Sequence, residues 1–195
     1  MRKLAIWFLT LCLTSSFMGY AQEIVSFKLT PEATFLSNDG EDFIIVPYEG
    51  KSAHEIFQLL ATNAASVFND PSKVMSTVED KSIKFRSIIP VAQKEVKLLN
   101  QRTLAESKGF LQLEIRIKDG RIRISAPFVE NDIWIDGSPM QGNFQNLVSQ
   151  WYKPEKKEKK RIENENFRNS LESRVNLIVN SIIGSTPQME EDDDW

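Results

Sequence analysis

The chain has 195 residues, of which 41% are hydrophobic and 10% aromatic, a composition typical of a folded globular protein and not of a disordered one. Its 27 acidic residues exceed its 24 basic ones, and this mild acidity argues against nucleic acid as a partner. One histidine and one cysteine argue against a structural zinc site, which usually draws on several such residues.

Residues 1–21 have the pattern of a secretory signal peptide: a basic start, an apolar run from Leu4 to Phe17, and small residues before the expected cleavage between Ala21 and Gln22. The run is shorter than the about 20 residues that a transmembrane helix needs. Cys12 lies inside the run and not just after it, which argues against a lipid anchor. We therefore expect an exported protein, periplasmic or extracellular, that is neither a lipoprotein nor membrane-spanning once cleaved.

Cleavage would leave 174 of the 195 residues, enough for one domain with its own core. Two basic residues leave with the signal, so 22 basic residues remain against 27 acidic ones, a formal charge of −5. Cys12 leaves as well, which excludes thiol catalysis and disulfide bonds from the mature chain.

The first elements of the mature chain are predicted from alternation and capping signals. Residues 22–40 are expected to form an N-terminal strand, over 22–29, and a loop, after which a second strand covers 43–48. Ser52 and Glu55 have the spacing of a capping box and begin a helix that ends before Pro71. The main domain is expected over 41–185.

Two hairpins follow this helix. Residues 73–79 and 83–90 are predicted as paired strands, and 91–108 as a long polar connection that is irregular or partly helical. The hairpin from 110 to 128 turns at Asp119-Gly120, which suits a type I′ loop. This turn fixes a register that pairs Ile117 with Ile122, Ile115 with Ile124, Leu113 with Ala126 and Leu111 with Phe128, and Arg116 with Arg123 on the other face.

The C-terminal part is predicted to be mainly helical. A short strand over 132–137 precedes an amphipathic helix over 144–151. Pro154 can begin a second, long helix with a buried stripe, and Gly184 ends it. Residues 186–195, with five successive acids, are expected to form a disordered acidic tail.

This order of elements is the β-α-β-β-β-β-α order of one TATA-binding-protein-like repeat. Within it, two segments resemble a secreted Bacteroidetes domain-of-unknown-function family with that fold. They are Val46-Pro47-Tyr48-Glu49-Gly50-Lys51-Ser52 and Ile117-Lys118-Asp119-Gly120-Arg121-Ile122-Arg123. The resemblance covers residues 43–128. It implies an α+β domain with a single antiparallel sheet and two helices packed on one face, and it implies no activity, catalytic residue or DNA binding.

The hairpin register places basic side chains together on the sheet face opposite the apolar one. The candidate ligand face consists of Lys84, Arg86, Arg116, Lys118, Arg121 and Arg123. Such a face could hold an anionic ligand, a polysaccharide or an acidic partner, or it could simply be solvated.

The sequence predicts no catalytic, cofactor-binding or metal-ligating residues. His54, the only histidine, is expected to be an exposed residue in the first turn of its helix. The acidic groups at 39–42 and at Asp132 and Asp136 lack the spacing of a calcium loop. Their composition predicts solvated turns.

Three functions remain open. The first is a non-enzymatic binding module for an envelope protein or glycan. The second is a carboxylate-dependent hydrolase acting on envelope or glycan polymers, which needs two carboxyl groups in a cleft. The third is a structural, oligomerising envelope protein.

Overall fold

The computed structural model describes residues 24–98, 101–135 and 138–185. The expected cleavage position at Ala21 and Gln22, and the tail at 186–195, lie outside these residues. The described elements are β1 (Phe27–Leu29), β2 (Phe35–Ser37), β3 (Phe43–Pro47), α2 (Ala53–Val67), α3 (Pro71–Val74), β4 (Met75–Val78), β5 (Ser82–Leu98), β6 (Gln101–Lys118), β7 (Arg121–Ser125), β8 (Phe128–Ile135), β9 (Ser138–Asn143), α4 (Phe144–Trp151) and α5 (Glu158–Ile183).

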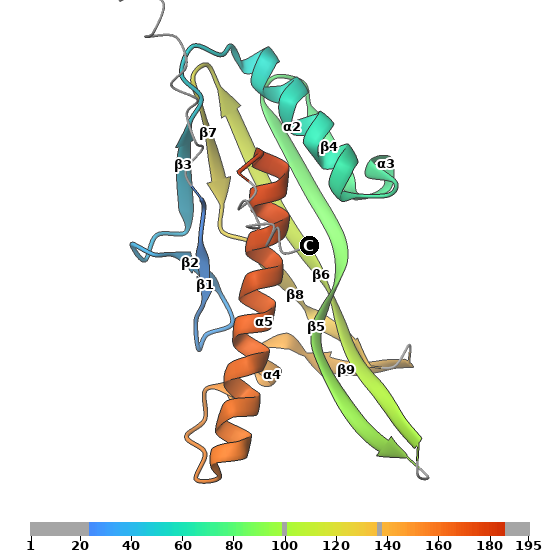
Figure 1. Ribbon diagram of the computed structural model, residues 1–195. Coiled ribbons are helices and arrows are strands. Elements are labelled where there is room, and N and C mark those ends of the chain that lie inside the picture. Colours follow the sequence, from blue (N-terminus) through green and yellow to red (C-terminus); the bar gives the residue numbers. More distant parts are fainter. Residues whose placement is uncertain (1–23, 99–100, 136–137, 186–195) are drawn as a thin grey trace, which may run out of the picture.

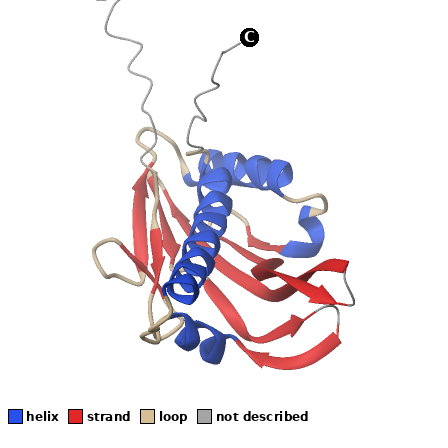
Figure 2. Cartoon of the chain, turned by 60° about the horizontal axis from the view of Figure 1, so that its bottom comes forward, coloured by secondary structure: helices blue, strands red, loops and turns tan. Residues whose placement is uncertain are grey.

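The molecule has two layers, a large antiparallel sheet and the helices that cover one of its faces (Figures 1 and 2). The sheet has seven strands, in the order β3-β7-β6-β5-β4, with β8 paired to β6 and β9 paired to β8. Helices α2 and α5 pack on each other and on this sheet. The α+β fold that the sequence predicts, with its strand and helix order and two helices on one face, is therefore confirmed, with further strands added to it.

The start of α2 and the end of α5 lie where the sequence indicates. The Ser52 side chain accepts from the Glu55 backbone while the Glu55 side chain accepts from the Ser52 N–H at 2.7 Å, which completes the capping box of α2. Gly184 ends α5 in the left-handed conformation that glycine tolerates, with φ of 81°. The predicted start of α5 at Pro154 is wrong, because the helix begins at Glu158 after a short irregular segment.

The second hairpin turns at Asp119-Gly120 as predicted, and its register holds over the first residues. The predicted type I′ conformation is wrong, because that type needs a positive φ at both residues and only Gly120 has one. Gly120 has φ of 72°, and Ile117 pairs with Ile122 as expected. The predicted pairing of Leu111 with Phe128 is wrong, because β7 ends at Ser125 and the chain re-enters the sheet as β8, which pairs Leu111 with Val129. Pro127 separates the two strands and has no N–H to donate to a continuing ladder.

The expectation of an irregular segment over 91–108 is also wrong. Strands β5 and β6 continue through it as one long antiparallel pair that reaches Leu98 and Gln101, with an irregularity between Pro90 and Ala92 (Figure 1). Arg174 of α5 donates to the Pro90 carbonyl and ties this irregularity to the helix. The ladder is made by backbone groups, so this segment can form it without an alternating sequence pattern.

The N-terminal segment lies in a separate two-stranded sheet of β1 and β2, of which the sequence predicted only the first strand. Side chains of α5 take the place of a neighbouring strand along β1. Three backbone N–H groups donate to side-chain oxygens of α5 at 2.8–3.0 Å: Val25 to Asn180, Phe27 to Asn176, and Leu29 to Glu172. The Asn180 and Asn176 amides donate back to the carbonyls of Val25 and Phe27 at 2.7 and 2.9 Å.

We define the helix-to-strand ladder as the hydrogen bonds of residues 172, 176 and 180 of α5 to the backbone of Val25, Phe27 and Leu29. It forms because the two backbones have matching repeats. Helix residues four apart are about 6 Å apart along the axis, close to the about 6.8 Å that two residues of a strand span. The side chains of Val25, Phe27 and Leu29 are all buried. The ladder therefore satisfies the backbone of a strand edge that is covered by the core.

Candidate functional site

The open face of the sheet carries a shallow hollow at the end where β3, β7 and β6 lie side by side. The hollow has a volume of about 270 Å³ and is lined by Ile45, Arg116, Lys118, Arg121, Ile122 and Arg123. Strand pairing places Arg116 directly opposite Arg123 and Lys118 directly opposite Arg121. Four of the six cations of the predicted ligand face therefore meet in one place, as the turn register predicts.

Two of the four cations in the hollow are partly neutralised. Nε of Arg116 lies 3.3 Å from a Glu114 carboxylate oxygen on the same strand. The Arg123 guanidinium lies over the Phe43 ring, 4.1 Å from its centre, and 4.0 Å from a carboxylate oxygen of Asp42. The Nε atom of Arg123 is buried, and no described residue accepts its hydrogen.

The other two cations, Lys118 and Arg121, form no ion pair with any residue that the structure describes. Both are exposed, next to the turn that joins β6 and β7. Like charges directly opposite each other destabilise a pair of strands. The hollow thus concentrates positive charge that the described part of the fold leaves without a counter-ion.

The remaining two residues of the predicted ligand face lie on the open face but outside the hollow. Nζ of Lys84 is 3.6 Å from Glu114. Arg86 makes a two-pronged contact with Glu130 of β8, at 2.6 and 2.9 Å, and stacks 3.5 Å from the centre of the Phe110 ring. The hydrogen bonds from Arg86 hold the pKa of Glu130 below its ordinary value, which keeps this carboxylate charged. Arg86 is therefore committed to an internal pair.

Sequence reasoning missed three features of this face. Ile45 lies at the hollow because β3 pairs with β7, a contact between distant segments, and its side chain is 53% exposed. Glu130 neutralises Arg86 through a strand whose pairing was not predicted. Exposed Phe128 and Ile88 show that the same face has apolar side chains beyond the basic hollow. The residues of β3 are a continuous apolar run and do not alternate with polar ones, so nothing in the sequence indicates that Ile45 is exposed.

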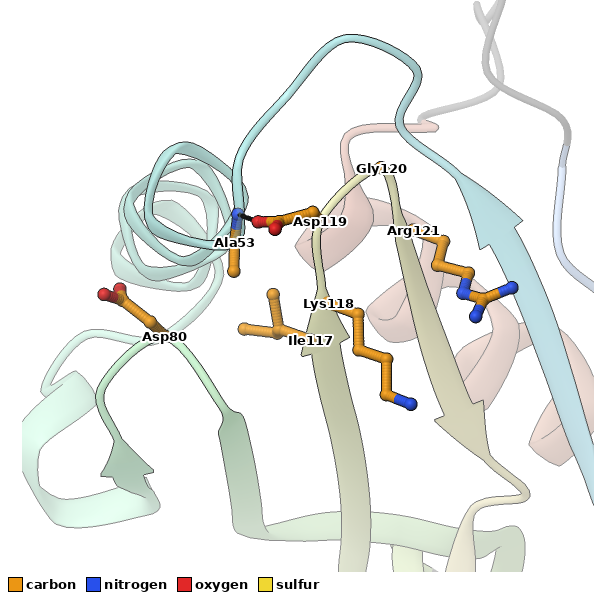
Figure 3. Close-up of a pocket in the computed structure, with 7 residues that line it drawn as sticks. All are labelled: Ala53, Asp80, Ile117, Lys118, Asp119, Gly120 and Arg121. Atoms are coloured by element: carbon orange, nitrogen blue, oxygen red, sulfur yellow. Dashed lines mark hydrogen bonds between the residues drawn. The ribbon is translucent and has the colours of Figure 1, made fainter.

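A second, wider pocket of about 660 Å³ lies at the edge of the sheet, where the β6–β7 turn meets the N-terminus of α2 (Figure 3). Asp119 accepts a hydrogen bond from the Ala53 backbone N–H at 2.7 Å and so fixes the turn to the helix. Lys118 and Arg121 line this pocket as well as the hollow. The two openings thus share the unpaired cations.

The carboxyl groups of the described residues whose pKa is shifted are all shifted downward by hydrogen bonds: Glu55 from Ser52, Asp70 from Ser72 and Lys73, Glu106 from Lys108 and Gln93, and Glu130 from Arg86. Asp39, Glu41 and Asp42 lie exposed in the loop between β2 and β3. The side chain of Asp132 and the whole of Asp136 lie outside the described part of the chain.

Fold and site together define a single α+β unit whose antiparallel sheet is covered by helices on one face and open, with a basic hollow, on the other. No known family model and no curated protein matches the chain. Among solved structures, it is similar to a TBP-like protein from the Bacteroidetes species Parabacteroides distasonis, with 14% identity and a TM-score of 0.41 over 72% of this chain and 90% of that one.

This likeness concerns the fold alone, and membership of the Bacteroidetes domain family stays a prediction. Of the helices that the structure describes, none is both long enough and apolar enough to cross a lipid bilayer.

Proposed function

We propose that this chain is an exported, non-enzymatic binding module that captures an extended acidic segment of an envelope protein in the basic hollow. The observation that carries the proposal is the cross-strand pair of Lys118 and Arg121, which form no ion pair with any described residue. This pair lies beside a second cross-strand pair, Arg116 and Arg123. Exposed like charges held opposite each other destabilise the pair of strands, and a bound anionic ligand would offset this repulsion.

The spacing of the cations favours a peptide. The two cross-strand pairs are two residues apart along β6 and β7, so their rows are separated by about 6.6–6.8 Å. An extended peptide presents alternate side chains at the same interval, because it has the same backbone repeat. A segment with an acidic residue at every second position would therefore place one carboxylate at each row. Exposed Ile45, which pairs with Arg123 across β3 and β7, offers apolar contact to the methylene groups of the acidic side chain at that row.

The test measures binding of a fluorescein-labelled peptide of alternating serine and glutamate by anisotropy. The protein is the expected mature chain, residues 22–195, which keeps every described residue. We expect Lys118→Glu combined with Arg121→Glu to weaken binding at least about tenfold, since like charges juxtaposed across an interface cost several kcal/mol. Lys28→Glu, an exposed charge reversal on the separate two-stranded sheet, is the matched control and should leave binding unchanged.

Residues 190–194 are five successive acids and could compete for the same cations, so the measurement is repeated on a chain that ends at Ser185. A peptide that binds the doubly reversed variant and the unmodified chain equally well, with or without residues 186–195, would overturn the proposal. The hydrolase and the oligomerising protein that the sequence left open stay predictions.

A further inference from the structure

His54, Glu79 and Asp80 come together at the end of the sheet from two separate elements. His54 is the second residue of α2, and the two acids follow β4 in the turn to β5. Nδ1 of His54 is 3.0 Å from Oδ1 of Asp80. One ring nitrogen of the histidine and one carboxylate oxygen of each acid all lie within 4.8 Å of one another.

The backbone holds both elements in place. At the helix, the capping box fixes the first turn of α2, and the Ala53 N–H is bonded to Asp119. At the turn, the Lys81 N–H donates to the Val78 carbonyl at 3.0 Å, while the Lys81 carbonyl accepts from the Ile117 N–H of β6 at 2.8 Å. The backbone positions of the helix start and of the turn are thus fixed, so only the side chains have to rotate to converge on one ligand.

The three donors match the chemistry of a first-row divalent transition metal. Zinc binds imidazole nitrogen at about 2.0–2.1 Å and carboxylate oxygen at about 2.0–2.2 Å, so its tetrahedral ligands lie about 3.4 Å apart. Small side-chain rotations bring donor atoms that are within 4.8 Å to that separation. Calcium and magnesium prefer oxygen ligands alone, so the imidazole selects against them.

We propose that His54, Glu79 and Asp80 bind one divalent transition-metal ion such as Zn²⁺, with water in the remaining coordination positions. The His54 side chain is 57% exposed and that of Asp80 is 40% exposed, so the ion would exchange with solvent and would not be locked into the core. The sequence argued against zinc because it has one histidine and predicts no metal ligands. The fold changes this by placing two carboxylates beside that histidine. The proposal uses no cation of the basic hollow and stands independently of the proposed function.

The test follows the ring signals of the histidine by NMR while zinc chloride is added to residues 22–195 prepared without an affinity tag. Because His54 is the only histidine of the chain, the spectrum holds one set of imidazole signals. We expect these signals to shift, to reach saturation near one equivalent of Zn²⁺, and to return when a chelator is added. Calcium at the same concentration should leave them in place.

Two variants test whether the carboxylates take part. Glu79→Gln and Asp80→Asn should each weaken Zn²⁺ binding at least about tenfold, since even groups outside the ligand shell are worth 10–100-fold. Asparagine tolerates the positive φ of 56° at position 80, so this variant keeps the turn, which circular dichroism and unfolding curves verify. Asp39→Asn, in a different exposed loop, is the control. Ring signals that do not move at a tenfold excess of Zn²⁺, or a Zn²⁺ affinity in both carboxylate variants that equals that of the unmodified chain, would overturn the proposal.

Discussion

Replacement of Asn180 by alanine tests the helix-to-strand ladder most directly. The Asn180 side chain is 2% exposed, accepts from the Val25 N–H and donates to the Val25 carbonyl. Asn180→Ala would leave both backbone groups buried without a partner. Each such group costs about 1–3 kcal/mol. Alanine returns about 0.7 kcal/mol or less through its higher helix propensity. We therefore expect a loss of about 2–5 kcal/mol in the free energy of unfolding.

The assay is urea unfolding of residues 22–195, with the midpoint compared at unchanged slope. Asn176→Ala should also destabilise the fold, because it would leave the N–H and the carbonyl of the fully buried Phe27 without their partners. Asn169→Ala is the matched control on the same helix, at an exposed position, and should change the free energy by no more than about 0.5 kcal/mol. If Asn180→Ala and Asn169→Ala unfold at the same urea concentration, the ladder does not hold β1 as argued.

Three further predictions concern the sheet. Arg86 lowers the pKa of Glu130 from its ordinary value of 4.5, so their pairing contributes stability above about pH 4.5. This stability is lost as the pH falls through the lowered pKa. The variant Glu130→Gln should therefore show a smaller fall in urea midpoint between about pH 5 and about pH 3. Gly120→Val should cost at least about 1–2 kcal/mol, because valine is strained at the positive φ of that turn, and thermal unfolding would measure this loss. Arg121→Glu should stabilise the fold by about 0.2–1 kcal/mol through an opposite-charge pair with Lys118 while it weakens peptide binding, and a variant that loses stability would contradict the like-charge reasoning.

The features that the sequence predicted correctly are governed by neighbouring residues. The capping box at Ser52 and the turn at Gly120 need only a few residues in series, and the turn fixed which cations face each other across β6 and β7. The errors arose where contacts between distant segments of the chain decide the strand pairing or the ion pairs. The β7 and β8 strands share one side of β6, and the bond between Arg86 and Glu130 joins residues 44 apart. A basic face could therefore be predicted, but not which of its charges are neutralised.

The meeting of His54 with Asp80 is another long-range outcome. The two residues are 26 apart and belong to a helix and a turn whose relative position is set by packing on the sheet. In the sequence, each of the two residues is typical of an ordinary exposed position. Only the fold brings their donor atoms to one point.

The ladder on β1 also constrains the order in which the chain can mature. Val25 and Asn180 are 155 residues apart, so the edge of β1 that faces away from β2 has no partner until the last helix has been synthesised. The backbone N–H groups of Val25, Phe27 and Leu29 therefore stay without their native acceptors until β1 docks onto α5, so the N-terminal strand is among the last parts of the fold to be completed.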